Sequence, residues 1–226
     1  YLNAYARALE KRGIPYDISG GGRLGNATEI SALLDLLETV HAPDNPLPFL
    51  GYLRGPFVGL GDDELYTFRR AGGVFNYRSP LPENLPEDLH TTLTHALERL
   101  ARASEFLGKN TPATALEFIL EDLGLPAFAA SQPMGSSRAG NLLRLLALVR
   151  QWESQGLHRG QVLTELRDLV YDPAYKVEET TLEAGRENVV RLMNLHQAKG
   201  LQARVVFLAD PADTSADRFG VDFHVS

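Results

Sequence analysis

Residues Asn188–Asp210 read NVVRLMNLHQAKGLQARVVFLAD, and this stretch decides the fold. Two apolar runs rich in β-branched residues, Val189–Met193 and Val205–Ala209, flank a polar centre. The pattern predicts a strand, a short exposed turn or helix, and a second strand. Strands this apolar usually lie in a sheet that is covered on both faces. The polar centre is therefore expected at a sheet edge, where α/β proteins place their sites.

This stretch resembles motif V of the UvrD/Rep-like superfamily 1 DNA helicases. The resemblance rests on the contiguous order LMNLHQAKGL, Leu192–Leu201, followed by the apolar run Val205–Leu208. The chain departs from the motif at two places: Asn194 stands where the motif has Thr, and Gln202-Ala203 stands where it has Glu-Phe. The Glu of the motif approaches the sugar of ATP, so the resemblance places the uncharged Gln202 on the nucleotide side.

The polar turn carries the candidate site residues. A lone histidine is more often structural than functional, but His196 stands between two apolar runs and beside Lys199-Gly200, which favours function. By resemblance, this turn binds the backbone of single-stranded DNA and links it to the nucleotide cleft. A glycine in the turn would allow close approach of that backbone. The residues expected to contact DNA or to couple it to the cleft are Asn194, His196, Lys199 and Gly200.

Two further segments narrow the resemblance to AddA/RecB-type helicase–nuclease subunits. ALEKRGIPYDISGGG, residues 8–22, resembles the place where a helix leads into a strand and a glycine turn. LRGPFVGLGDDELYTFRRAGG, residues 53–73, resembles their L-R-S-P-x-x-G-L-S-D-D-E-L segment. The implied fold class is α/β: a partial RecA-like, P-loop NTPase-type parallel sheet domain with a large all-helical insertion. In that scheme residues 1–44 and 187–226 form part of domain 2A, and residues 45–186 form the helical insertion, domain 2B.

Apolar periodicity predicts the helices of the insertion. Apolar residues recur at helical spacing, and Pro and Gly separate the periodic segments. Residues 132–140 are expected to be a connector, and residues 172–187 a polar loop that returns the chain to the sheet. The helices expected from periodicity, from the one that precedes the insertion onward, cover about residues 26–42, 46–54, 89–107, 112–123, 142–152 and 162–170.

No nucleotide-cradling loop of the G-x-x-x-x-G-K-[ST] type occurs in the 226 residues. ATP hydrolysis therefore cannot be the work of this chain alone, and no catalytic residue is predicted within it. Gly20–Gly25 fits the dinucleotide pattern G-x-G-x-x-G. The helix expected after it runs into Pro43–Pro46 rather than into a second strand, so a flexible turn is favoured over cofactor binding.

Clusters of acidic residues do not predict a metal site. Asp62-Asp63-Glu64 opens an expected helix, where capping and the helix dipole explain three acids. The acids and histidine near the C-terminal end of the sequence lack recognisable ligand spacing; they are Asp210, Asp213, Asp217, Asp222 and His224. Three arginines, Arg54, Arg69 and Arg70, could touch phosphate, although a solvated face is the commoner explanation.

Composition limits the classes of protein. The net charge is −7 with a pI near 5.4, so any contact with DNA must be a local patch. The sequence has no cysteine, which fits a reducing cytoplasm, and it has neither an apolar run long enough to span a membrane nor a signal peptide. Tyr1-Leu2 already lies within a helical pattern, which indicates a fragment of a longer protein.

The resemblance implies the C-terminal motor region of an ATP-dependent DNA helicase or exonuclease that acts in repair and recombination. The intact enzyme would bind ATP and magnesium and move 3′-to-5′ on single-stranded DNA. Its partners would be DNA, the N-terminal helicase domains of the same chain, and a nuclease domain or a second helicase–nuclease chain. The alternative is a degenerate helicase-like protein that only binds DNA or protein, and a helical interaction module is a third interpretation that leaves residues 189–208 unexplained.

Overall fold

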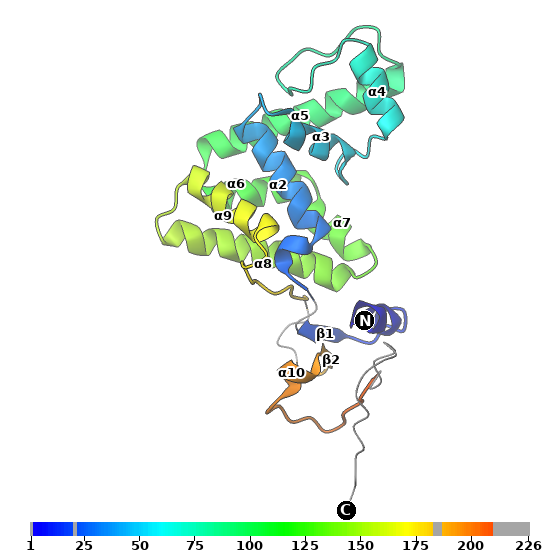
Figure 1. The fold of residues 1–226 in the computed structure, drawn as a ribbon, viewed down its shortest axis with the longest axis vertical. Helices are drawn as coiled ribbons and strands as arrows, with labels where there is room; N and C mark the ends of the chain where they lie inside the picture. The colour runs from blue at the N-terminus through cyan, green and yellow to red at the C-terminus, as the bar shows by residue number, and fades with distance from the viewer. Residues whose placement is uncertain (1, 20–21, 183–186, 210–226) are drawn as a thin grey trace, which may run out of the picture.

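The computed structural model describes residues 2–19, 22–182 and 187–209. Helices dominate this part of the chain, and a two-stranded parallel sheet lies at one end of them (Figure 1). The elements at the sheet end are α1 (Leu2–Glu10), β1 (Tyr16–Ser19), β2 (Val190–Met193) and α10 (Leu195–Ala198). The helical part comprises η1 (Leu24–Asn26), α2 (Thr28–His41), α3 (Pro46–Arg54), α4 (Asp62–Arg70), α5 (Glu87–Lys109), α6 (Pro112–Asp122), α7 (Leu125–Ser131), α8 (Gly135–Ser154) and α9 (Arg159–Tyr171).

Helix α2 is the centre of the bundle. It packs against α3, α5, α8 and α9, and its Ile30, Leu33 and Leu34 are fully buried. The other bundle helices add their apolar faces to the same hydrophobic core. The bundle therefore has one continuous core, which is the main stabilising element of a domain of this size.

The predicted helix ends are confirmed where local sequence determines them. Pro46 occupies the first turn of α3, and the Asn45 side chain accepts a hydrogen bond from Leu47 N at 3.2 Å. At the start of α4, Glu64 Oε2 accepts from Gly61 N at 2.7 Å. These acids and caps satisfy backbone N–H groups that have no partner within the helix.

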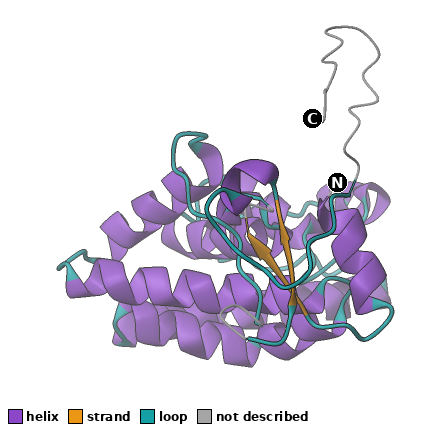
Figure 2. Cartoon of the chain, turned by 90° about the horizontal axis from the view of Figure 1, so that it is seen from below, coloured by secondary structure: helices purple, strands orange, loops and turns teal. Residues whose placement is uncertain are grey.

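The sheet is small and only half covered. Strands β1 and β2 pair in parallel, with Tyr16 beside Val190 and Ile18 beside Leu192 (Figure 2). Helix α1 packs on both strands, and Ala6, Tyr16 and Ile18 form a small separate core with it. Val190 is 40% exposed, so the expectation of a sheet covered on both faces is wrong for the described residues.

The predicted strand Val205–Ala209 is also wrong in this structure. These residues have no strand conformation, and Val205, Val206, Phe207 and Leu208 are 68%, 77%, 87% and 69% exposed. A strand is held by hydrogen bonds to a neighbouring strand and by packing on its face, and β-propensity alone does not supply either. Within the described ranges, β1 and β2 pair with each other, and no third strand joins them.

Tertiary contacts extend the helices beyond the sequence prediction. Residues 135–140, expected in a connector, form the first turns of α8. The Glu10 carboxylate accepts hydrogen bonds from Met134 N at 2.8 Å and Gly135 N at 3.0 Å, and so caps α8 from outside the bundle. The short helix α7 was not predicted; it buries Leu125 and Ala129.

The proposed division of the chain at residue 44 remains a prediction, but the packing bears on it. Helix α2 falls before residue 44 and yet contributes its buried face to the bundle core. This packing favours a junction before Leu24. Among the described residues, no helix is both long and apolar enough to cross a lipid bilayer.

Candidate nucleic-acid interface

The polar turn begins where β2 ends. Asn194 is the N-cap of α10, and its Oδ1 accepts a hydrogen bond from Gln197 N at 3.0 Å. Asn and Thr are both N-cap residues because each offers a side-chain oxygen at that position. The departure at Asn194 therefore keeps the capping function that a Thr would have.

The turn closes at Gly200. Leu201 N donates to Ala198 O at 3.0 Å, and Gly200 has a φ of +84°, a left-handed conformation that strains other residues. No heavy atom lies within 4 Å of the position that a Cβ at Gly200 would occupy. The glycine is thus explained by its backbone conformation, and the space beside it is open.

The structure places most of the predicted site residues on the surface. Asn194, His196, Lys199 and Gly200 are exposed, and so is Gln202, which lies in the irregular segment after the turn. The first four come together on one turn of backbone because α10 is only four residues long. They can contact a ligand without displacing any part of the core.

Gln197 is a residue of this turn that the sequence analysis did not single out. Its side-chain Nε2 donates to Glu178 Oε1 at 3.0 Å, and so joins α10 to the polar loop that returns from the bundle. Its Oε1 is buried and has no hydrogen-bond partner among the described residues. Its place between His196 and Lys199 in the motif was the available signal.

The turn is locally basic in an acidic chain. Residues 187–209 contain three cationic side chains, Arg191, Lys199 and Arg204, and one acid, Glu187. All three cations are exposed, and within residues 187–209 none forms an ion pair with a carboxylate of the described chain. A polyanion would meet uncompensated positive charge at this end of the molecule.

The glycine-rich segment has a structural explanation at Gly25. A Cβ at this position would lie 1.8 Å from the carbonyl oxygen of Leu169, at the end of α9. Gly25 therefore permits close packing of η1 on α9. Gly20 and Gly21 lie outside the described residues.

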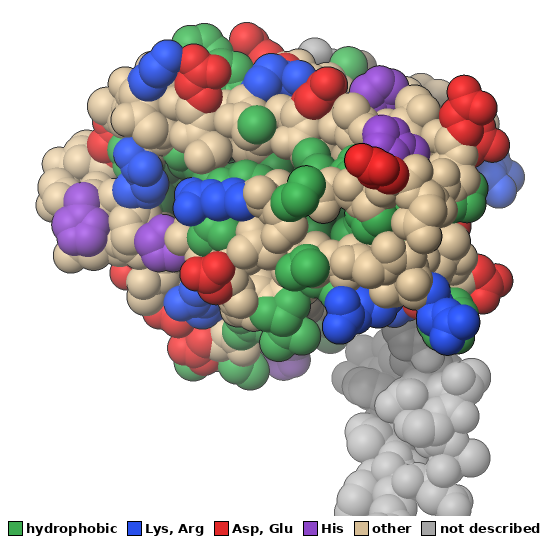
Figure 3. Space-filling model, turned by 90° about the horizontal axis from the view of Figure 1, so that it is seen from above, with side chains coloured by type: hydrophobic (Ala, Val, Ile, Leu, Met, Phe, Trp, Pro, Cys, Tyr) green, Lys and Arg blue, Asp and Glu red, His purple; other side chains and the backbone are tan. Residues whose placement is uncertain are grey.

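The other charged residues singled out in the sequence are engaged locally. Arg54 pairs with Asp62 at 2.8 Å, and Arg69 donates to Gly73 O at 2.9 Å. Arg70 lies over the ring of Tyr66, with 6.0 Å from its Cζ to the ring centroid. Seen from above, positive and negative side chains are interspersed rather than gathered in one basic field (Figure 3).

No group of three or more potential metal ligands occurs in the part of the chain that the structure describes. Asp62, Asp63 and Glu64 lie in the first turn of α4. The C-terminal acids that were weighed as ligands, together with His224, lie outside the described residues.

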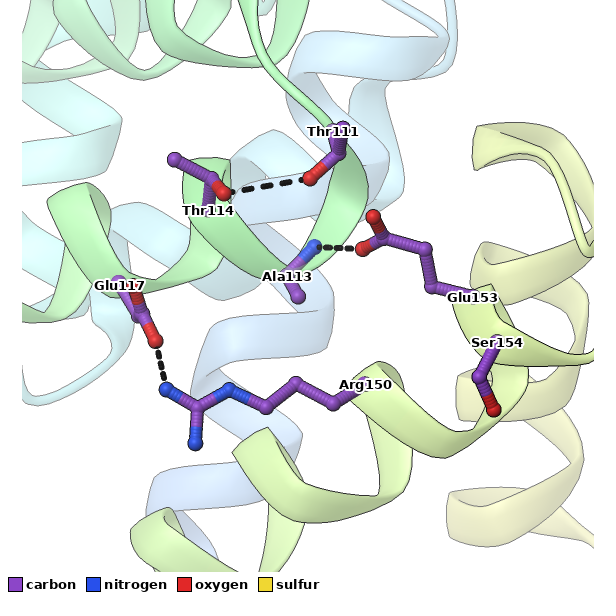
Figure 4. A pocket seen from close by; sticks show the side chains of 7 residues that line it. All are labelled: Thr111, Ala113, Thr114, Glu117, Arg150, Glu153 and Ser154. Carbon is purple, nitrogen blue, oxygen red and sulfur yellow. Dashed lines mark hydrogen bonds and ion pairs between the residues drawn. The ribbon is translucent and has the colours of Figure 1, made fainter.

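A polar hollow of about 490 Å³ lies between the start of α6 and the end of α8, apart from the turn. Glu153 Oε2 accepts from Ala113 N at 2.9 Å, and Arg150 pairs with Glu117 (Figure 4). These groups satisfy one another and join two helices. We assign the hollow a structural role.

Comparison with known proteins supports the family resemblance. No protein-family profile matches the chain. Three of the curated relatives that it matches bear the name of the AddA-type chain of an ATP-dependent helicase/nuclease. They come from Desulforudis audaxviator (30% identical over 211 residues, 91% of this chain), Pelotomaculum thermopropionicum (27% over 213 residues, 92%) and Pediococcus pentosaceus (29% over 217 residues, 89%). The resemblance to AddA-type proteins inferred from the sequence is thereby confirmed. The chain spans 17% of the length of each of these relatives.

Proposed function

We propose that this chain, as a relative of the AddA-type helicase/nuclease proteins along nine-tenths of its length, is a segment of a DNA-translocating motor. The observation that carries the proposal is the coincidence of two findings. The chain matches proteins that are named for ATP-dependent helicase and nuclease activity. The motif V residues form an exposed, locally basic turn at a strand end.

In this proposal the turn meets single-stranded DNA. His196 and Lys199 are exposed and lie one helical turn apart at most, so both can reach one stretch of backbone. Lys199 would neutralise a phosphate, and His196 would donate a hydrogen bond to the backbone or relay its presence. Such contacts position the strand and carry no sequence information.

ATP and magnesium belong to the proposed whole protein. The described residues do not form a cradle for a nucleotide: the sequence has no phosphate-binding loop, and Gln202 is an exposed amide in an irregular segment. We therefore assign no step of hydrolysis to residues of this chain. Gln202 would contribute at most a hydrogen bond from the side of the nucleotide.

The proposed architecture is a RecA-like domain 2A built around α1, β1, β2 and α10, with the bundle as its domain 2B. The bundle enters and leaves through two adjacent connections, Gly22–Arg23 and Val177–Glu179, which pair through Leu24 N–Val177 O at 2.8 Å and Glu179 N–Gly22 O at 3.1 Å. Further domains of the same protein would supply the rest of the sheet and the nucleotide site.

The test compares Lys199→Ala and His196→Ala in the full-length protein that carries this chain. For Lys199→Ala we expect weaker binding of single-stranded DNA, with the slope of log affinity against log salt reduced by about 0.7. For His196→Ala we expect lower DNA-dependent ATP turnover with little change in that slope. Both side chains are exposed, so thermal melting should be unchanged.

Two outcomes would count against the proposal. If both variants melt well below the wild type while DNA affinity and turnover per folded molecule are unchanged, the turn is structural. If the full-length wild-type protein binds DNA without hydrolysing ATP, the alternative of a degenerate helicase-like protein is favoured, as the Gln202-Ala203 departure suggests. The isolated 226-residue chain is expected to show no ATP turnover in either case.

A further inference from the structure

A second hollow opens in the bundle, and it is unlike the polar one between α6 and α8. It measures about 280 Å³ and is lined by α2, α5, α6, α8 and α9, with no lining residue from the sheet end. Most of the side chains that face it are aliphatic; they include Val40, Leu107, Leu116, Val149, Leu163 and Leu166. It is large enough for one bulky apolar side chain and small for a complete cofactor.

The rim of this apolar pocket is basic. His41, Arg78 and Arg159 are exposed side chains that line it, and no Asp or Glu does. In the described part of the chain neither arginine forms an ion pair with a carboxylate. Arg78 instead lies over the ring of Tyr77, 5.6 Å from its Cζ to the ring centroid.

The nearest carboxylates along the lining helices are already paired. Glu38, one residue after Leu37 of the pocket, binds Arg167 at 2.7 Å. Glu105, one residue after Ser104 of the pocket, binds Lys109. The positive charge of the rim is therefore not cancelled from within the protein, although the whole chain carries a net charge of −7.

We propose that this pocket binds an acidic peptide segment through one bulky apolar residue. The apolar side chain would fill the cavity, and the carboxylates beside it would pair with Arg78 and Arg159. The aliphatic lining offers few groups that could satisfy the polar edges of a nucleic-acid base, so a polynucleotide fits it poorly. The acidic surface elsewhere would repel such a peptide, which makes the rim its preferred landing point.

This inference does not depend on the proposed function, because it uses neither the α10 turn nor DNA. The probe is a short fluorescein-labelled peptide in which several Asp residues precede a C-terminal Leu-Phe with a free carboxylate. Binding to the 226-residue chain is followed by fluorescence anisotropy. Two matched peptides, one with Phe replaced by Ser and one with every Asp replaced by Asn, are both expected to bind at least about tenfold more weakly.

Three variants test the site from the protein side. Arg78→Glu and Arg159→Glu reverse the rim charge, and each should weaken binding about tenfold, more at low salt than at high salt. Gly108→Leu should block the pocket: a Cβ there meets no heavy atom within 4 Å, so the helix should accept the side chain without strain. Arg144→Glu is the matched control, since Arg144 is exposed on α8 and does not line the pocket.

The proposal is overturned if the Phe-to-Ser peptide binds as well as the parent, or if Arg144→Glu weakens binding as much as the rim reversals do. It also fails if decanoate or a single-stranded oligonucleotide binds with the same dependence on Gly108, Arg78 and Arg159 while the peptide does not. The peptide comparison uses the wild-type chain, so its result does not depend on the folding of any variant.

Discussion

The bundle and the sheet end of this molecule differ in how far each satisfies itself. Phe68 in the bundle is 2% exposed and meets Phe75 edge-on, with ring centroids 5.4 Å apart. Phe207, in the apolar run after the α10 turn, is 87% exposed. Helices make their backbone hydrogen bonds within themselves and need only a packed face, whereas a strand needs a neighbour for its backbone as well.

The two regions are joined by a few polar contacts. Glu10 caps α8, Thr181 Oγ1 donates to Asp17 Oδ1 at 3.0 Å, and Asn141 Nδ2 donates to the buried Glu29 at 3.1 Å. Asn141 Oδ1 also accepts from Thr180 N at 3.1 Å, so one side chain ties α2, α8 and the returning loop together. The difference between the regions thus predicts graded effects of mutation.

The largest effect is expected in the bundle core. Phe68→Ala removes a buried aromatic ring and should lower the free energy of unfolding by about 3–5 kcal/mol. Denaturant unfolding followed by helical circular dichroism measures it. Tyr66→Ala on the same helix is the control, because Tyr66 is 65% exposed and should change stability by less than about 0.5 kcal/mol. Equal effects of the two variants would contradict a packed core at α4.

A smaller effect is expected at the junction. Glu10→Ala removes the carboxylate that accepts from Met134 N and Gly135 N, and should cost about 1–2 kcal/mol. Hydrogen exchange at the start of α8 should accelerate more than exchange in the middle of α2. The exposed neighbour Lys11 provides the control as Lys11→Ala. Unchanged exchange at residues 134–138 would show that α8 begins there without help from α1.

A pH effect of modest size is expected at Asp35 of α2. Burial, with the nearby Glu38 carboxylate, raises the pKa of Asp35 from 3.8 to about 6. The folded chain therefore holds this proton more tightly than the unfolded chain, so its contribution to stability is present below about pH 4 and is lost as the pH rises to about 6. Asp35→Asn should flatten this fall and, after screening by solvent, stabilise the chain at pH 7 by about 1 kcal/mol or less.

The measurement is the unfolding free energy of the wild type and of Asp35→Asn between about pH 4 and pH 7. A wild type that gains stability relative to the variant over this range would reverse the sign and disprove the assignment. The exposed Asp63→Asn of α4 serves as control, and the difference between it and the wild type should not vary with pH in that window.

The smallest effect is expected at the exposed run. Phe207→Ala should change the unfolding free energy of this chain by less than about 0.5 kcal/mol, because little surface is buried there. The same denaturant experiment used for Phe68 gives a direct comparison of one residue type in two surroundings. A loss of more than about 1 kcal/mol would mean that the run packs on the fold, and would remove the contrast between the regions.

The sequence by itself determined the features that are local. Periodicity and caps placed the bundle helices, from the Asn45 cap of α3 to the long apolar stripe of α5, because helix hydrogen bonds close within a few residues. The strand at β2, the polar turn after it and the exposure of His196 and Lys199 were likewise readable from the order of residues. Motif V supplied the resemblance that the curated relatives confirm.

Only the tertiary structure decided what depends on partners distant in sequence. The first turns of α8 form because Glu10 reaches Gly135 across the junction, and Gly25 is needed because Leu169 approaches it. Gln197 enters the candidate site through Glu178, a contact that no local pattern encodes. The apolar run 205–209 has the composition of a strand and lacks the conformation, because strand formation is decided by a neighbouring strand rather than by propensity.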